Sequence, residues 1–284
     1  MNNFSENKIT IKNKTPLLKA KMKTPITYYG GKQNLVKELI WLIPPHEIYV
    51  EPYFWGGALF RAKEPSPSEI INDTNMNVVN FYEVLKKNYK ALHEKIEATL
   101  HSRETYKKAL FIYETPRLFA DSPVIRARAF YVSCNQWFCS RIGSFWYSKD
   151  NKCPTTFQNK IQNFKEEMSN RLSLTQIEQN QADKVIQSRD HEDTFFYCDP
   201  PYIGTNQWHY GGYHEDDFIR DLTVLSQIKW KFLLSNFPSK ILDRFVKEHQ
   251  WYVKTFDQPL SASHNSKKAL NKRKTEVLVA NYPI

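Results

Sequence analysis

The sequence predicts an α/β fold in which a parallel sheet is interrupted by a long insertion. Short apolar segments alternate with helical patterns up to about residue 98 and again after residue 190, whereas residues 100–190 break this rhythm. The 284 residues suffice for one large domain with a sizeable insert. We therefore expect one sheet built from two stretches of chain, separated by an insertion of about 110 residues that includes this stretch, a length within the usual size range of a domain.

The elements before the insertion follow the order helix, strand, helix, strand, helix. Apolar residues at helical spacing predict a helix over 34–43, which ends before Pro44 because proline disfavours helix in the residue preceding it. Short apolar runs predict buried strands at 48–50 and 70–71, and the pattern of 75–98 predicts one long helix. This order is typical of a nucleotide-binding sheet.

The insertion and the second half of the sheet have their own signals. Within the insertion, the pattern predicts a helix over 124–139, a hairpin over 140–147 and a loop at 150–152. After it, strands are predicted at 194–198, 231–235, 251–256 and 275–280, with helices over 215–228 and 240–249.

Charge and composition narrow the classes of function. The chain has 40 Lys and Arg against 30 Asp and Glu, a formal net charge of +10, which favours a polyanion such as nucleic acid. Residues 1–23 hold six lysines and one glutamate, so we expect a flexible basic arm, either along a phosphate backbone or as a solubilising tail. No apolar run is long enough to span a membrane, and the first residues lack a secretory pattern.

The cysteines do not predict a metal site. Cys134, Cys139, Cys153 and Cys198 include no C-x-x-C pair, and no histidine spacing completes a zinc site. We expect reduced, mostly buried thiols and no metal.

The strongest chemical signal is the segment Asp199, Pro200, Pro201 and Tyr202. It directly follows an apolar strand, at the edge where open α/β sheets bind ligands. The two prolines fix the backbone, so the Asp199 carboxylate and the Pro200 carbonyl can both accept hydrogen bonds from an exocyclic amino group. Tyr202 offers a flat face for a planar ring. The alternative is an ordinary strand-end aspartate followed by a proline turn.

Three other segments suit a nucleoside-sized cofactor. Gly30 and Gly31 precede the first helix, where the backbone could approach a ligand closely. A second glycine pair lies in the strand-to-helix loop 51–58, which is not a G-x-G-x-x-G dinucleotide fingerprint. Asp73 ends the next strand, where it could bind ribose hydroxyls or cap the following helix. The predicted cofactor-binding residues are Tyr28, Gly30, Gly31, Lys32, Glu51, Tyr53, Phe54, Gly56, Gly57, Asp73 and Asp199.

Together these segments resemble the Dam-type (D12 class) DNA adenine-N6 methyltransferases, which use S-adenosyl-L-methionine. The resemblance covers the chain from Thr24 to Asn281. Residues 28–32 look like the family's amino-terminal cofactor motif, 51–60 like its glycine loop and 71–73 like its ribose-binding acid. Residues 199–202 are similar to its D-P-P-Y catalytic motif, and the segments 210–217, 234–236 and 272–278 also fit the family.

The resemblance implies a Rossmann-like methyltransferase sheet with an inserted, mostly helical DNA-recognition domain that carries a β-hairpin. The catalytic domain would then comprise 24–75 and 191–284, and the target-recognition insertion 76–190. The implied reaction is site-specific methylation of an adenine flipped out of double-stranded DNA. We expect a cytoplasmic monomer, bacterial or phage-encoded and associated with DNA, with a cognate restriction endonuclease as one setting. A catalytically impaired DNA-binding protein of this fold and an RNA amino-methyltransferase are the alternatives.

Donor side chains in the insertion and near the carboxyl terminus are the candidates for DNA contact. These side chains could equally form ion pairs or hydrogen bonds within the protein. These residues are Arg126, Arg128, Asn135, Gln136, Arg141, Lys267, Lys268, Lys272, Arg273 and Lys274.

One position departs from the family pattern. The family's glycine loop reads F-x-G-x-G, and alignment on Gly56 and Gly57 places Tyr53 at the phenylalanine and Trp55 at the first glycine. Tryptophan adopts the positive φ of such a glycine only at a cost. A shifted loop, an altered cofactor affinity or impaired catalysis could follow, and we expect a shifted loop.

Overall fold

The computed structural model describes residues 23–27, 32–137, 143–150, 152–203, 212–259 and 273–284. Most of the predicted basic arm lies outside these ranges. So do some of the predicted site residues, namely Tyr28, Gly30, Gly31, Arg141, Lys267, Lys268 and Lys272.

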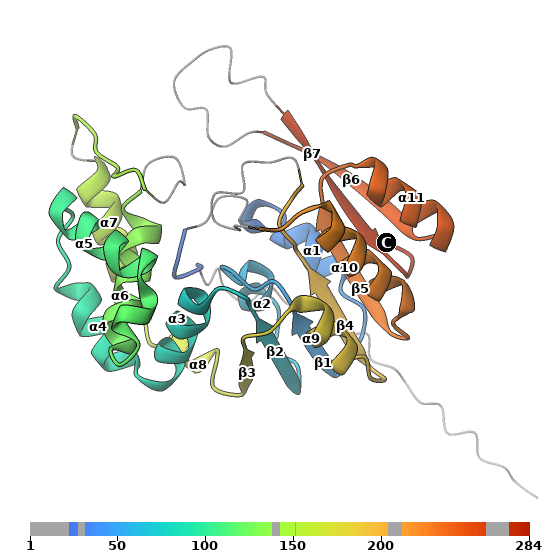
Figure 1. The fold of residues 1–284 in the computed structure, drawn as a ribbon, viewed down its shortest axis with the longest axis horizontal. Coiled ribbons are helices and arrows are strands. Elements are labelled where there is room, and N and C mark those ends of the chain that lie inside the picture. The colour runs from blue at the N-terminus through green and yellow to red at the C-terminus, as the bar shows by residue number, and fades with distance from the viewer. Residues whose placement is uncertain (1–22, 28–31, 138–142, 151, 204–211, 260–272) are drawn as a thin grey trace, which may run out of the picture.

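The described strands form one seven-stranded sheet, which confirms the predicted α/β, Rossmann-like fold (Figure 1). The spatial order is β3-β2-β1-β4-β5-β7-β6. Neighbouring strands are parallel from β3 to β5, and β7 runs antiparallel to both β5 and β6. The strands are β1 (Ile48–Glu51), β2 (Ser68–Asn72), β3 (Thr175–Glu178), β4 (Thr194–Cys198), β5 (Lys231–Asn236), β6 (Tyr252–Pro259) and β7 (Arg273–Ala280).

The strand order reverses between β1 and β4. After β1 the chain adds β2 on one side and later β4 on the other, with Val50 of β1 opposite Phe196 of β4. At such a reversal the connections leave in opposite directions, and a ligand crevice opens beyond the carboxyl ends of the two strands. The topology therefore places the expected site at the ends of β1 and β4.

Helices cover both faces of the sheet. Alternate strand residues point to opposite faces. Tyr49 and Phe195 join the cluster that contains α1, α2 and α3, whereas Val50 and Phe196 join the cluster with α9, α10 and α11. These helices, with the 3-10 turn η1 (Lys32–Asn34) before them, are α1 (Val36–Leu42), α2 (Ala58–Ala62), α3 (Met76–Lys87), α9 (Ala182–Ser188), α10 (Glu215–Gln227) and α11 (Lys240–His249).

The insertion is mostly helical and packs around α6, which contacts α3, α4 and α5 (Figure 1). An antiparallel bridge between Trp137 and Phe145 is the described part of the predicted hairpin. The further elements are α4 (Tyr89–Glu97), α5 (Arg103–Glu114), η2 (Pro116–Phe119), α6 (Pro123–Asn135), α7 (Lys152–Gln162) and α8 (Glu167–Asn170).

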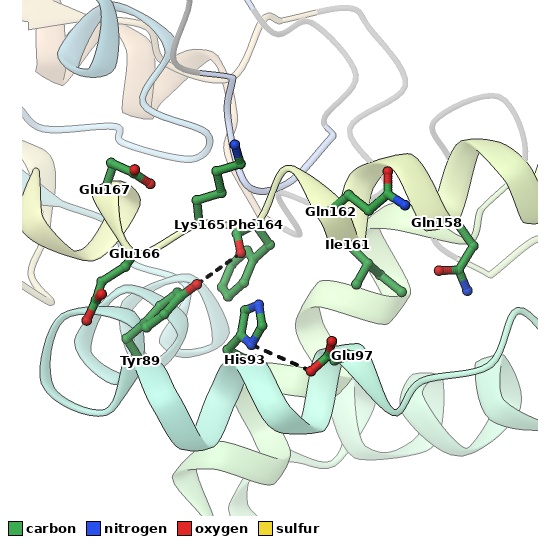
Figure 2. Close-up of a pocket in the computed structure, with 10 residues that line it drawn as sticks. All are labelled: Tyr89, His93, Glu97, Gln158, Ile161, Gln162, Phe164, Lys165, Glu166 and Glu167. Atoms are coloured by element: carbon green, nitrogen blue, oxygen red, sulfur yellow. Dashed lines mark hydrogen bonds and ion pairs between the residues drawn. The ribbon is translucent and has the colours of Figure 1, made fainter.

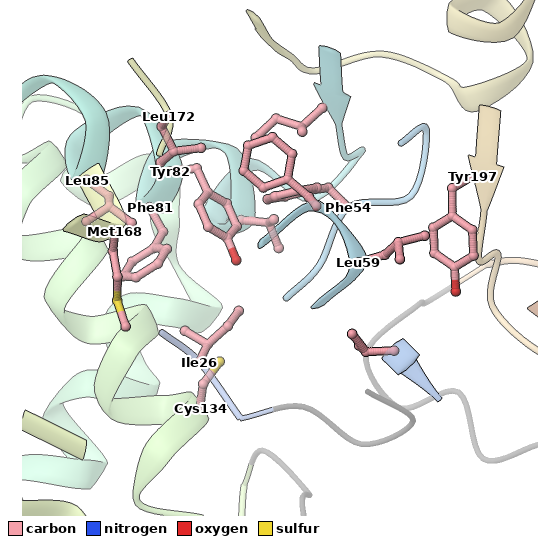
Figure 3. Packing of buried hydrophobic residues seen from close by; sticks show 14 of the residues in the cluster. Ile26, Phe54, Leu59, Phe81, Tyr82, Leu85, Cys134, Met168, Leu172 and Tyr197 are labelled. Carbon is pink, nitrogen blue, oxygen red and sulfur yellow. The ribbon is translucent and has the colours of Figure 1, made fainter. Parts of the chain in front are cut away.

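The insertion and the sheet share one hydrophobic cluster. Figure 3 shows Met168 of α8 near Phe81 of α3 and Cys134 of α6 near Ile26, and the same cluster includes Tyr82 and Leu59. Tyr197 of β4 belongs to the same cluster. The sheet and part of the insertion therefore share one core, while a smaller buried cluster that includes Tyr106, Val132 and Trp137 lies within the insertion.

Two predicted boundaries are wrong. The helix predicted over 75–98 is broken at Asn88, whose φ of −143° and ψ of 48° are not helical, so α3 and α4 are separate helices. The predicted insertion 76–190 also includes β3 and α9, which belong to the sheet layers because β3 pairs with β2. The Thr-Gln-Ile-Glu sequence of β3 is that of a short edge strand and lacks the apolar run that marks a buried one.

Other expectations concern membranes, thiols and metals. Within the described ranges, none of the helices has the length and apolarity needed to cross a bilayer. Cys134, Cys153 and Cys198 are free and buried, and Cys139 lies outside the described residues. The same ranges contain no group of three His, Cys, Asp or Glu side chains arranged to hold a metal ion.

Candidate active site

The tip of β4 reaches the surface of the sheet's carboxyl edge. All five residues of β4 are buried, whereas the side chain of Asp199, which follows it, is 23% exposed. Pro201, two residues further on, lines a cavity shared with Asp73 from the end of β2. The segment 199–202 is therefore neither sealed inside the core nor turned away from the predicted cofactor side.

One oxygen of the Asp199 carboxylate is held by protein groups. Lys32 Nζ lies 2.8 Å from Asp199 Oδ1, and the Tyr202 hydroxyl oxygen lies 3.1 Å from the same oxygen. No described residue donates a hydrogen bond to Oδ2, so this oxygen remains as an acceptor for a ligand. Lys32 was predicted to bind the cofactor, and the structure pairs it with the carboxylates of Asp199 and Glu276.

A second carboxylate, that of Glu276, shares Lys32 as a partner with Asp199. Glu276 of β7 is 1% exposed, and its Oε1 lies 3.2 Å from Lys32 Nζ. The same oxygen accepts hydrogen bonds from the Ser235 hydroxyl of β5, at 2.7 Å, and from the Tyr202 hydroxyl. Lys32 also donates to the Tyr202 hydroxyl. Asp199, Lys32, Tyr202, Ser235 and Glu276 thus form one network, which we call the β4-tip cluster.

Burial and charge shape the proton affinities in this cluster. Burial raises the pKa of Asp199, an effect that Lys32 opposes and Glu276 reinforces. Burial by itself would lower the pKa of Lys32, but its two carboxylate neighbours outweigh that effect and raise it. Lys32 is therefore a permanent cation between Asp199 and Glu276.

The cavity beside this tip has a volume of about 480 Å³, which suits a cofactor-sized molecule. Acidic and aromatic side chains dominate its wall, and Arg220 is the one basic residue among the described residues that line it. The lining residues are Pro52, Tyr53, Trp55, Asp73, Thr74, Asn75, Gln181, Ala182, Pro201, Gly212, Tyr213, Asp217, Arg220 and Asp221. Aromatic faces and carboxylate acceptors are the groups that would hold a purine ring and ribose hydroxyls, and a negative wall suits a cationic ligand.

Asp73 accepts hydrogen bonds from backbone groups next to this wall. Its Oδ2 accepts the Trp55 N–H at 3.2 Å and its Oδ1 accepts the Asn75 N–H at 2.8 Å. Burial raises the pKa of Asp73 to about 7, even though these hydrogen bonds favour its ionised form. Asn75, not Asp73, caps α3, because the Asn75 side chain accepts the Asn77 N–H at 2.9 Å.

Trp55 has a positive φ, the backbone conformation that glycine adopts most easily. Its φ is +42°, and Gly57, two residues further on, has a φ of +58°. Two contacts hold Trp55 in this conformation: its N–H donates to Asp73, and its carbonyl accepts the Tyr82 hydroxyl at 2.7 Å. The surrounding structure therefore imposes on a tryptophan a backbone conformation that usually belongs to glycine.

Other predicted cofactor residues support the loop and do not line the cavity. Glu51 is buried, and its Oε1 accepts the Tyr49 hydroxyl at 2.5 Å and the Phe60 N–H at 2.9 Å. Burial raises the pKa of Glu51 to about 8. A Cβ on Gly57 would lie 2.3 Å from the buried Phe54 ring, so this glycine is required by packing within the protein. Gly56 also lies outside the lining, and its Cβ would be only in ordinary contact with Thr24.

Several lining residues were missed by the sequence reasoning. Asp221 of α10 is 4% exposed and accepts the Tyr53 hydroxyl and, at 2.8 Å, the Tyr213 hydroxyl. Burial raises the pKa of Asp221, which these two donors oppose. Asp217, Arg220 and Asp221 recur at helical spacing soon after the β4 tip, and that spacing was the available signal.

Four of the predicted DNA contacts are used within the protein. Asn135 is 1% exposed and Gln136 is fully buried, so predicting them as DNA contacts is wrong. Asn135 donates to the Pro25 carbonyl, and Gln136 donates to the Leu100 carbonyl. Arg126 is largely buried and donates to the Met76 carbonyl, and Arg128 donates to Thr99 Oγ1 at 2.8 Å. For Arg273 and Lys274 the structure describes only the backbone, at the start of β7.

A second cavity, of about 450 Å³, lies on the insertion between α4 and α7 (Figure 2). It is lined by the stacked rings of Tyr89 and Phe164, by His93 and by the acids Glu97, Glu166 and Glu167. None of the residues that line it comes from the strand ends that form the first cavity.

The fold and site together define an α/β protein with a ligand crevice at the β1/β4 reversal and a D-P-P-Y tip beside it. Comparison with known proteins is more specific. The sequence profile of the D12 class N6 adenine-specific DNA methyltransferases matches residues 28–257, and the chain belongs to this family. The resemblance inferred from the motifs is thereby confirmed.

Two known proteins resemble this chain, one in sequence and one in structure. The Type II methyltransferase M1.LlaDCHI of Lactococcus lactis subsp. cremoris is 27% identical over 306 aligned positions, which cover 99% of each chain. Among solved structures, PH1948 from Pyrococcus horikoshii, described as a candidate RNA methyltransferase, aligns with 93% of this chain and 91% of its own. Its identity is 11% and its TM-score 0.36, values too low to support an argument about function.

Proposed function

We propose that this protein is a site-specific DNA adenine-N6 methyltransferase that uses S-adenosyl-L-methionine and acts on an adenine flipped out of duplex DNA. The observation that carries the proposal is the carboxylate of Asp199 at the sheet's ligand-binding edge, with Oδ1 held by Lys32 and Tyr202 and Oδ2 left to accept. Family membership supports the choice of DNA over RNA.

The cofactor chemistry fits the residues present. Asp73, Tyr53 and Trp55 would contact the nucleoside part in the cavity, and the acidic wall suits a positive charge. When bound, S-adenosyl-L-methionine supplies an electrophilic methyl group on a sulfonium, so that a new N–C bond forms as the C–S bond breaks.

The protein's contribution is to orient and polarise the amino group. The lone pair of an adenine N6 is delocalised into the ring, which makes it a poor nucleophile. Asp199 Oδ2 and the Pro200 carbonyl would accept its two N–H groups, favour a more tetrahedral nitrogen and stabilise the positive charge that grows on it. The methylated nitrogen then releases one proton, which passes to water through Asp199.

Base flipping follows from the position of this tip. An N6 atom inside a duplex cannot reach a carboxylate at the edge of a sheet, so the base must leave the stack at a cost of a few kcal/mol. The positive formal charge of the chain favours binding of the phosphate backbone.

Substitution of Asp199 tests the proposal. Asp199→Ala should reduce methyl transfer from labelled cofactor to plasmid DNA by at least about 100-fold, because one of the two acceptors for the amino group is lost. Circular dichroism and thermal unfolding report whether the variant is folded. The matched control is Asp243→Ala, which removes an exposed carboxylate from α11 and should leave the rate unchanged. Full turnover by a folded Asp199→Ala variant would overturn the assignment.

The same experiment separates the alternatives. Sequencing of the modified plasmid locates the methylated adenines, and an RNA transcript of the plasmid serves as the competing substrate. Calorimetry with S-adenosyl-L-methionine distinguishes a protein that binds the cofactor without turnover from one that does not bind it.

A further inference from the structure

We infer that Glu276 is a positioning residue for methyl transfer, which acts on Asp199 through Lys32 and Tyr202. This inference rests on the proposed function and extends it to a strand at the far end of the chain. Glu276 makes no described contact with Asp199 itself, so it is not a catalytic residue.

The geometry assigns this role through a shared pair of neighbours. Lys32 Nζ and the Tyr202 hydroxyl are the two groups that hold Asp199 Oδ1, and both also contact Glu276 Oε1. Glu276 therefore restrains the positions of Lys32 Nζ and the Tyr202 hydroxyl. With Oδ1 occupied by donors of fixed position, the direction in which Oδ2 accepts is fixed as well.

The position of Glu276 within the sheet makes this support rigid. Glu276 lies on β7, and Ser235, which donates to it at 2.7 Å, lies on the neighbouring strand β5. Glu276 is 1% exposed and Ser235 is fully buried. A carboxylate with two hydroxyl donors and one ammonium around a single oxygen has little freedom to reorient.

Glu276 also acts on Asp199 by charge. The titratable groups that face Asp199 are Lys32 from η1, Glu51 from β1, Tyr197 and Cys198 from β4, Tyr202 after it and Glu276 from β7. Removal of the negative charge of Glu276 lowers the pKa of Asp199, because one of the neighbours that raise it is gone. In such a variant the Asp199 carboxylate stays ionised, and can accept hydrogen bonds, to a lower pH than in the wild type.

Two variants separate orientation from charge. Glu276→Gln keeps an oxygen that can accept from Ser235 and Tyr202 but loses the ion pair with Lys32, whereas Glu276→Ala loses all three contacts. In single-turnover methyl transfer, the rate should fall about 10-fold in Glu276→Gln and about 100-fold in Glu276→Ala, because a small misplacement of the reacting groups is costly. The acid limb of the rate against pH should move to lower pH in Glu276→Gln.

The control is another buried carboxylate in ion pairs. Glu69 lies at the amino end of β2 and is paired with Lys63, at 2.6 Å, and with Arg171. Glu69→Gln removes comparable buried interactions from the same sheet, so it should lower stability without changing the rate or its acid limb. All variants are compared at a temperature where thermal unfolding shows them folded.

The outcomes are distinct. A normal rate in both Glu276 variants would overturn the inference, and so would a lower rate with an unmoved acid limb, which would indicate a structural role alone. Loss of methyl transfer in Asp199→Ala but not in the Glu276 variants would leave the proposed function standing. Absence of DNA methylation by the wild-type protein would overturn both.

Discussion

The backbone of Trp55 is the clearest conflict between a residue and its conformation. A positive φ costs a residue with a Cβ about 1 kcal/mol relative to glycine. Substitution by glycine and by alanine removes the same indole, so the two variants differ mainly in this cost. Trp55→Gly should therefore be about 1 kcal/mol more stable than Trp55→Ala, as measured by urea unfolding.

A second tryptophan provides the control. Trp41 is an exposed residue of α1, where glycine is a poorer helix former than alanine. At this position the order should reverse, with Trp41→Gly about 1 kcal/mol less stable than Trp41→Ala. The same order at both positions would show that the positive φ of Trp55 is not a source of strain.

At the scale of the element, α11 depends on its first cap. The Ser239 side chain accepts the Leu242 N–H at 3.1 Å, which satisfies one of the donors that a helix start leaves unpaired. Ser239→Ala should lower the free energy of unfolding by about 1 kcal/mol. Ser239→Thr keeps the hydroxyl and should retain most of that stability in the same thermal or urea titration. Equal losses in both variants would assign the effect to something other than the cap.

The elements that could be predicted from the sequence are those whose own residues decide their burial. The apolar runs of β1, β4 and β5 are buried on both faces, and each was located to within one residue at either end. By contrast, β3 is an edge strand of mixed polarity that forms because β2 offers it a partner. The residues of β3 and their neighbours in the sequence do not indicate this pairing.

The same distinction applies to the site. The position of Asp199 at a strand end followed from the residues around it. The contact of Lys32 with Glu276 depends on how β7 is placed beside β5, and neither residue's neighbours in the sequence indicate that placement. The predicted donors Asn135 and Gln136 failed for a related reason, because their burial is set by the packing of α6 against distant segments.

For the whole molecule, buried carboxylates make stability depend on pH. Burial raises the pKa of Glu51 to about 8, well above its value of about 4.5 without burial. Between these values the folded state binds more protons than the unfolded state, so the contribution of Glu51 to stability falls as pH rises. Replacement by glutamine removes this titration. From pH 5 to pH 8, Glu51→Gln should therefore gain stability relative to the wild type, on the order of a few kcal/mol.

Glu69→Gln supplies the control for this titration as well. Burial alone would raise the pKa of Glu69, but Arg171 and Lys63 outweigh it and lower that pKa below 4.5. Its contribution is therefore constant above about pH 5 and is lost only at more acidic pH. The stability difference between Glu69→Gln and the wild type should not change from pH 5 to pH 8. Urea titrations at the two pH values measure both differences, and parallel behaviour of the two variants would contradict the assignment for Glu51.

The hydrophobic cluster that joins the insertion to the sheet limits how new target specificities could be engineered. Transplanting α4 to α8 of a relative into this chain would leave Phe81 and Tyr82 of α3 facing side chains that did not evolve with them. A chimera cut between α3 and α4 should therefore aggregate or melt early, whereas one that exchanges α3 together with α4 to α8 would carry its matching contact surface with it. Under the proposed function, an exchange of target specificity would therefore have to include α3, which shares a buried cluster with the sheet.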